Sequence, residues 1–116
     1  MSQIFCKRIY DKASADDGFR ILIDRLWPRG ISKEEACIDE WLKDIAPSNE
    51  LRTWFHHQPE LFPEFKSKYI EELKSKNQLI THILHIAKTQ KVCLLYGAKD
   101  KENNQAVVLL GVLLNN

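Results

Sequence analysis

The fold of this chain is decided by one stretch, Phe19-Arg20-Ile21-Leu22-Ile23-Asp24-Arg25-Leu26-Trp27-Pro28-Arg29-Gly30-Ile31-Ser32. Its first part, Phe19–Leu26, contains a continuous apolar run at Ile21–Ile23 instead of alternating polar and apolar residues. A strand that is apolar on both faces is typical of a parallel sheet that is covered on both sides. We therefore predict that Phe19–Leu26 is a buried strand of an α/β protein.

Two more apolar segments predict further strands, Ile4–Tyr10 and Val92–Tyr96. Between and after them, capping residues or prolines precede apolar residues at helical spacing, which predicts helices. These helices are expected to begin near Ser32, Ser48, Pro59 and Leu79. The final stretch from Asn103 could be a buried helix or a strand, and Asn103 as an N-cap favours the helix. The order of elements predicts a single α/β domain over residues 1–116, with a small, mostly parallel sheet of about four strands flanked by helices.

Residues 37–45 fit two different structures. The apolar residues Ile38, Trp41, Leu42 and Ile45 recur at helical spacing, and this periodicity favours a helix. The same residues could instead form a third strand after a short helix. Both alternatives keep the chain in the α/β class.

The composition excludes several classes of protein. Seventeen Lys and Arg against sixteen Asp and Glu leave a net charge of +1, whereas a protein that coats nucleic acid carries a large basic excess. Three cysteines form no CxxC motif and cannot all pair, which indicates a reducing, cytoplasmic location. The longest apolar stretch, Ala106–Leu114, is nine residues, too short for a membrane span. We expect it to be a buried core helix or, alternatively, a homodimer face.

The segment after the central predicted strand has the composition of an anion site. Ligands of open α/β sheets bind beyond the carboxyl ends of strands, and the helix start that follows offers unpaired N–H donors. Arginines add bidentate donors and a lysine adds a point charge, while the tryptophan could stack on a ring or wall off the pocket. The ligand-binding residues predicted in this segment are Arg25, Trp27, Arg29, Gly30, Ser32 and Lys33.

A second polar loop, residues 97–104, follows the last predicted strand. In a parallel sheet it opens on the same side as the first loop, so Lys99 and Asn104 are predicted to orient the ligand. Asp24 and Asp100 could then serve as paired carboxylates for acid–base chemistry or for Mg²⁺ held with substrate phosphates, and they are the candidate catalytic residues. No metal-ligand motif is present, so no resident metal site is predicted and the cofactor stays open.

A structural interpretation of the same residues is the alternative. Asp24 would pair with an arginine, Trp27 would plug the edge of the sheet, Pro28–Gly30 would shape a turn, and residues 97–104 would be a solvated turn.

Three functions are compatible with the sequence. The first is binding of an anionic small molecule such as a nucleotide or phosphate ester, and the second is a protein-interaction module. Nucleic-acid binding comes third, because it requires Lys7, Arg8, Arg25, Arg29, Lys33 and Lys43 to share one face.

The motifs Lys7–Asp11, Asp17–Lys33, Trp41–Ser48 and Leu94–Asp100 extend over nearly the whole chain. Together they closely resemble the YeaO-like family, a branch of family 488 of domains of unknown function. The resemblance implies a small cytoplasmic α/β domain and a strand at 37–43, but no reaction, cofactor or substrate. Longer relatives bear cysteines where this chain has other residues, so no cysteine chemistry is implied. Whether the chain is an enzyme stays open.

Overall fold

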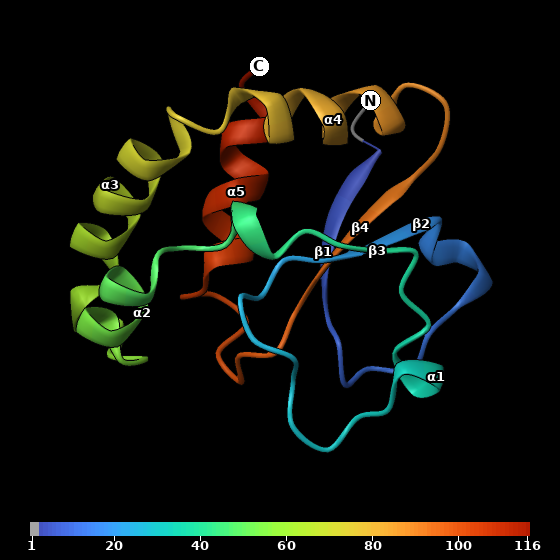
Figure 1. The fold of residues 1–116 in the computed structure, drawn as a ribbon, viewed down its shortest axis with the longest axis horizontal. Coiled ribbons are helices and arrows are strands. Elements are labelled where there is room, and N and C mark those ends of the chain that lie inside the picture. The colour runs from blue at the N-terminus through green and yellow to red at the C-terminus, as the bar shows by residue number, and fades with distance from the viewer. Residues whose placement is uncertain (1–2) are drawn as a thin grey trace.

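The computed structural model describes residues 3–116, which form a four-stranded parallel sheet and five α-helices (Figure 1). The strands are β1 (Ile4–Arg8), β2 (Phe19–Leu22), β3 (Glu40–Trp41) and β4 (Val92–Tyr96). The helices are α1 (Lys33–Ala36), α2 (Asn49–Phe55), α3 (Phe62–Leu73), α4 (Asn77–Ala87) and α5 (Gln105–Leu114). The predicted α/β class with a small parallel sheet is confirmed.

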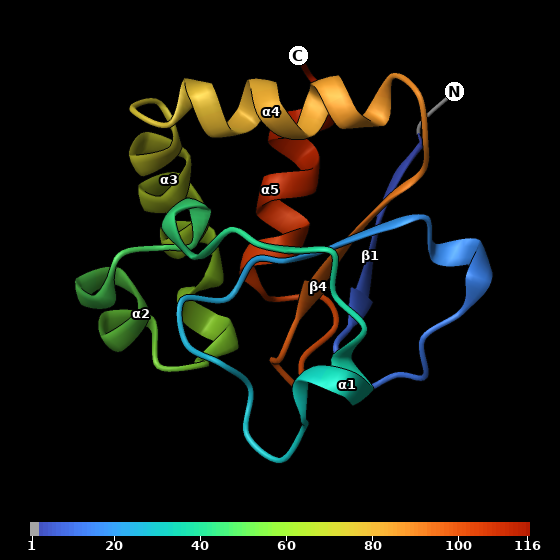
Figure 2. The ribbon, with the colours of Figure 1, turned by 45° about the vertical axis from the view of Figure 1, so that its right-hand side comes forward.

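The order of strands in the sheet is β1-β4-β2-β3, and each neighbouring pair is parallel. The two central strands, β2 and β4, are in register at Ile21 and Leu94. All five residues of β4 are buried, which explains its continuous apolar sequence. Because β2 and β4 are parallel neighbours, the loops that follow them leave the same edge of the sheet, and both lie at the lower edge in Figures 1 and 2.

The two faces of the sheet are covered unequally. The larger core packs α2, α3, α4 and α5 against one face, with Tyr69, Ile83 and Leu109 fully buried in it. The opposite face holds a smaller cluster around Leu22 and Leu95, covered by the single turn of α1 and by the side chains of loops. Both faces are covered as expected, but on the second face most of the cover comes from irregular chain.

The helix favoured for residues 37–45 is wrong. Glu40–Trp41 forms the edge strand β3, and Lys43–Ile45 forms a 3₁₀ turn. Backbone N–H groups of Asp39 and Leu42 donate to the carbonyls of Arg20 and Leu22, so this segment continues the sheet. A short strand followed by a 3₁₀ turn also places apolar side chains three or four positions apart, which is why the periodicity was misleading.

Several boundaries also differ from those predicted, and the first strand, β1, ends at Arg8 instead of Tyr10. Strand β2 ends at Leu22 instead of Leu26, with one more sheet hydrogen bond from Ile23 N to Leu95 O. The predicted last helix is present, but its N-cap is Asn104 and not Asn103. This helix buries Ala106, Val108, Leu109 and Leu113, whereas Val107 and Leu114 are exposed. No helix within residues 3–116 is both long and apolar enough to cross a membrane.

Candidate functional site

A cavity of about 760 Å³ opens at the carboxyl edge of the sheet. Its walls come from the loop after β2, the loop after β4, the start of α5, and the segment that carries α2. Its size is within the range of pockets that hold small molecules and cofactors. The lining residues are Tyr10, Asp24, Arg25, Leu26, Trp27, Pro28, Arg29, Ala46, Pro47, Arg52, Phe55, His57, Phe65, Gly97, Ala98, Lys99, Asp100, Asn103, Asn104 and Gln105.

Asp24 forms the polar floor of the cavity at the carboxyl end of β2. Its Oδ2 accepts from the backbone N–H of Gly97 at 2.9 Å, and its Oδ1 accepts from Nε2 of Gln105. Burial raises the pKa of this carboxyl group to about 6, although these two hydrogen bonds and the charge of Arg52 act in the opposite direction. The arginine pair of the structural interpretation is not formed, because no ion pair joins Asp24 to a described basic residue.

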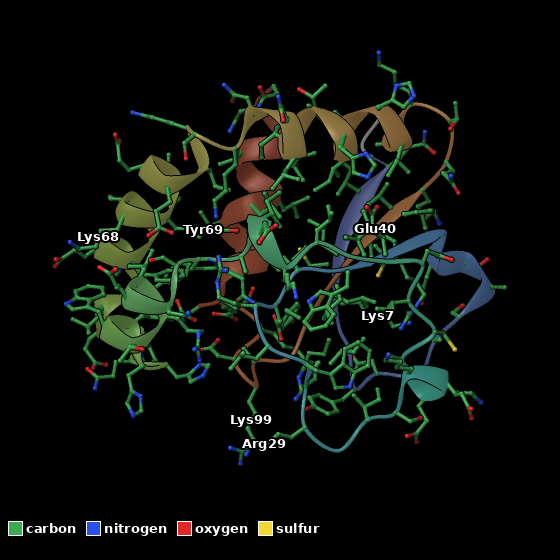
Figure 3. The ribbon with its side chains drawn as sticks, viewed as in Figure 1. Lys7, Arg29, Glu40, Lys68, Tyr69 and Lys99 are labelled. Carbon is green, nitrogen blue, oxygen red and sulfur yellow. The ribbon has the colours of Figure 1, made fainter. Side chains whose placement is uncertain are left out.

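Three exposed cations, Arg29, Arg52 and Lys99, line the rim of the cavity. In Figure 3 both Arg29 and Lys99 lie at the lower edge of the molecule. Among the described residues, none of the three forms an ion pair with a carboxylate, and only Arg52 donates a side-chain hydrogen bond, to Oδ1 of Asn49. Their charges are therefore available to an anion.

Arg25 has a different environment from Arg29. Its Nε donates to the carbonyl of Pro47 at 2.9 Å, and its Nη2 donates to the carbonyl of Ala46 at 3.0 Å. Lys76 donates to the same Ala46 carbonyl. Arg25 thus lines the cavity, but much of its donor capacity fixes the segment that leads into α2.

The other predicted residues of the second loop also make internal contacts. The carboxylate of Asp100 accepts from the N–H groups of Glu102 and Asn103 and from Nδ2 of Asn103, and these hydrogen bonds lower the pKa of Asp100. The side chain of Asn104 caps α5 through Val107 N and donates to the Asp100 carbonyl at 2.8 Å. Asp24 and Asp100 both line the cavity.

Gly30, Ser32 and Lys33 lie outside this cavity. Ser32 Oγ accepts from Glu35 N, and the Glu35 carboxylate accepts from Ser32 N, so the start of α1 is occupied by its own capping box. Gly30 has a φ of 76°, which suits the turn. The structure therefore separates the helix start from the two loops with which it was grouped.

Trp27 forms one wall of the cavity. Its ring packs edge-on against Trp41 at a centroid distance of 5.4 Å, and its Nε1 donates to the carbonyl of Ile31 at 2.8 Å. These contacts hold the ring between the cavity and the smaller core cluster. Trp27 thus lines the cavity with an indole ring that the surrounding structure holds in place.

The sequence-based reasoning did not include Arg52, Phe55, His57 and Gln105 among the site residues. The first three come from α2 and the turn after it, and only the tertiary fold brings this turn to the sheet edge. His57 has a positive φ of 55°, and the preceding His56 has a φ of 45°. Two consecutive left-handed residues other than glycine are uncommon, and this backbone feature cannot be read from the sequence.

The basic residues that nucleic-acid binding would require do not form one free face. Lys7 forms an ion pair with Asp17 at 3.1 Å, and Arg8 donates to the carbonyls of Ala98 and Gly97. Among residues 3–116, no group of three or more His, Cys, Asp or Glu side chains is placed to hold a metal ion.

The fold and the cavity define a small parallel α/β domain with a polar pocket at the carboxyl ends of its central strands. Within this class, the chain belongs to the DUF488 family: residues 3–116 match the family model described as "Inactive DUF488-N3 subclade".

Two curated relatives illustrate the family. The chain is 48% identical over 106 residues to "Uncharacterized protein YeaO" of Escherichia coli (strain K12). The matched region covers 91% of this chain and 92% of that protein. It is 56% identical over 66 residues to "Uncharacterized protein Rv3073c" of Mycobacterium tuberculosis (strain ATCC 25618 / H37Rv), covering 57% of this chain and 56% of the relative. No solved structure gives a significant match. The resemblance to the YeaO-like family is confirmed.

Proposed function

We propose that this protein binds an anionic small molecule, a phosphate ester or nucleotide, in the cavity at the carboxyl edge of the sheet. The observation that carries the proposal is the set of rim cations Arg29, Arg52 and Lys99, which line the cavity without a described carboxylate partner. Guanidinium and ammonium groups without an ion-pair partner are well suited to phosphate oxygens. Apolar side chains such as Phe55 and Pro28 provide the contact area that holds the remainder of a ligand.

The proposed activity is binding, and the protonation states of Asp24 and Asp100 determine which acid–base steps the cavity could support. Asp100 is kept ionised by its own loop, while burial places the pKa of Asp24 at about 6. Asp24 is thus the cavity carboxylate that can change protonation near neutral pH, and any acid–base step would depend on it. The description of the matching subclade as inactive fits a domain that binds a ligand without turning it over.

Thermal unfolding with added ligands tests the proposal. The probes are inorganic phosphate, ribose 5-phosphate and ribonucleoside monophosphates, because a ligand that binds only the native state raises its stability by about 2.7 kcal/mol at a hundred times Kd. We expect at least one of them to raise the Tm saturably, and Arg29→Ala or Lys99→Ala to abolish the rise. Lys33→Ala is the matched control, since Lys33 is an exposed cation outside the cavity. No shift with any probe, or a shift lost only in Lys33→Ala, would overturn the proposal.

Docking of another protein on residues 24–30 is the second candidate function. It is favoured by two exposed apolar side chains that line the same cavity, Leu26 at 59% and Tyr10 at 42% exposure. Large apolar side chains exposed together are a feature of interaction sites. If this function holds, phosphates leave the Tm unchanged, and Leu26→Asp abolishes co-purification of a specific partner that Lys33→Asp retains.

A further inference from the structure

We propose that the ligand is a hydroxyl-bearing phosphate ester, such as a sugar phosphate, whose phosphate lies among the rim cations and whose hydroxyls donate to Asp24 and Gln105 on the floor. This inference rests on the proposed function and specifies the chemistry of the remainder of the ligand. It follows from the way hydrogen-bond donors and acceptors are distributed within the cavity.

Asp24 has acceptor capacity left over. An ionised carboxylate offers about four lone-pair sites, and the floor fills only two of them, with Gly97 N and Gln105 Nε2. The side chain lines the cavity, so the remaining sites are open to whatever occupies it. These sites accept hydrogen bonds only from donors such as hydroxyl or amino groups.

Gln105 adds a second acceptor to the floor. Because its Nε2 donates to the Asp24 carboxylate, its amide orientation is fixed, and Oε1 is left as the free end. No described residue donates a hydrogen bond to this oxygen, and among residues 3–116 no fully buried side-chain polar atom lacks a partner. Oε1 of Gln105 is therefore reached by solvent or by a ligand.

The cavity thus separates its charges by position. The negative floor repels a phosphate, and the rim cations attract it, so the phosphate is held at the mouth. A ligand body without donors would displace water from the floor acceptors and leave them unpaired, which weakens binding. A body with hydroxyls replaces those lost hydrogen bonds, so the floor selects for it. Burial raises the pKa of Asp24 to about 6, which agrees with a carboxylate that is poorly solvated.

Calorimetric titration with two matched probes tests the inference. Ribose 5-phosphate and pentyl phosphate have the same charge and the same number of carbons, but only the first carries hydroxyl donors. At about pH 8, where Asp24 is ionised, we expect ribose 5-phosphate to bind at least about tenfold more tightly, as one to two hydrogen bonds to a charged group imply.

The variant Asp24→Asn should reduce this preference to less than about threefold while pentyl phosphate still binds. Asp24→Asn is isosteric, and a flip of the Gln105 amide restores its hydrogen bond. Gln105→Met is the second variant, should Asp24→Asn fail to fold, and Gln78→Met on α4 is the matched control that keeps the full preference.

The possible outcomes separate the two proposals. Equal binding of ribose 5-phosphate and pentyl phosphate by the unaltered protein would overturn the inference and leave the proposed function standing. A preference that survives in both Asp24→Asn and Gln105→Met would also overturn it. If neither compound, nor inorganic phosphate, nor any ribonucleoside monophosphate binds, the proposed function itself fails.

Discussion

Replacement of Gly97 by alanine tests how the floor of the cavity is assembled. The Cβ of an alanine at this position would lie 2.8 Å from Oδ2 of Asp24, closer than a carbon and an oxygen can pack. The carboxylate has little freedom to retreat, because its oxygens accept from Gly97 N and Gln105 Nε2. Gly97→Ala must therefore move Asp24 or the end of β4, and either movement weakens these hydrogen bonds.

The size of the effect follows from overpacking and from hydrogen bonding. Overpacking a tight site costs about 1–3 kcal/mol, and weakening a hydrogen bond to a charged group costs about 1.5–3 kcal/mol. A single movement of Asp24 or of the end of β4 both relieves the overlap and weakens the hydrogen bonds, so the two costs do not add in full. We therefore expect Gly97→Ala to lower the free energy of unfolding by about 2–3 kcal/mol. For a domain of this size the Tm falls by roughly 4 °C per kcal/mol, or about 10 °C in all.

Urea denaturation of two alanine variants and one double-mutant cycle provides the measurement. Gly111→Ala is the matched control: it lies within α5 and nothing is within 4 Å of its added Cβ, so we expect it to stabilise by about 0.5–1 kcal/mol. In an Asp24→Ala background the clash is absent, and Gly97→Ala should cost at least about 1 kcal/mol less than in the unaltered protein. The reasoning would be refuted if Gly97→Ala and Gly111→Ala changed the free energy of unfolding in the same direction. It would also be refuted if the double-mutant cycle gave a coupling energy near zero between Gly97→Ala and Asp24→Ala.

Three further predictions concern other groups. Because burial raises the pKa of Asp24 from 3.8 to about 6, the folded protein keeps a proton that the unfolded chain has lost. Stability should therefore decrease as the pH rises from about 4 to about 6, by on the order of 3 kcal/mol, and urea titrations should show this decrease absent in Asp24→Asn. Arg20→Met breaks a buried ion pair with Asp17 and should cost about 3–5 kcal/mol in the same assay, whereas Lys74→Met on an exposed pair should cost less than about 1 kcal/mol. Asn104→Ala removes the buried cap of α5, and its Tm should fall by an amount equivalent to about 1–2 kcal/mol.

The central strands and the capped helices could be predicted from the sequence because their signals are local. Apolar residues occupy successive positions in both Ile21–Ile23 and Val92–Tyr96. Val92–Tyr96 is the central strand β4, and Ile21–Ile23 belongs to the other central strand, β2, with Ile23 just after its end. The capping box at Ser32 was visible as a motif for the same reason. Periodicity alone favoured a helix over the edge strand Glu40–Trp41, because two residues carry no period and the hydrogen bonds of this segment to β2 are tertiary. The strand was present only as the alternative and as what the family resemblance implied.

The candidate site was predictable only in part. Parallel topology brings the ends of β2 and β4 together, which is why Asp24 and Asp100 could be placed on one edge in advance. The contribution of Arg52 depends on how α2 packs, and the use of Arg25 on two backbone carbonyls depends on the path of residues 46–47. The distance of Lys33 from the cavity depends on the length of the loop before α1. Composition and spacing carry no information about these three features.

The arrangement around Asp24 offers a physical reason to assign the cavity to a ligand instead of to stability alone. A partly buried carboxylate with a raised pKa and no ion-pair partner in the described chain destabilises the fold at neutral pH. The close approach of this carboxylate also requires a glycine at position 97, which is the residue with the largest conformational entropy to lose on folding. An uncharged side chain at position 24 would avoid the cost of the buried charge, whereas an apolar one would also leave the Gly97 N–H and the Gln105 amide without their acceptor. Features that destabilise a fold and converge on one cavity are typical of functional sites, since the surrounding structure tolerates them for the sake of a ligand. On this reasoning Asp24→Asn, which removes the charge and keeps an acceptor for Gly97 N, should raise the free energy of unfolding at neutral pH while it reduces the preference for hydroxyl-bearing phosphates. A lower free energy of unfolding for Asp24→Asn at neutral pH would instead indicate a purely structural role for Asp24.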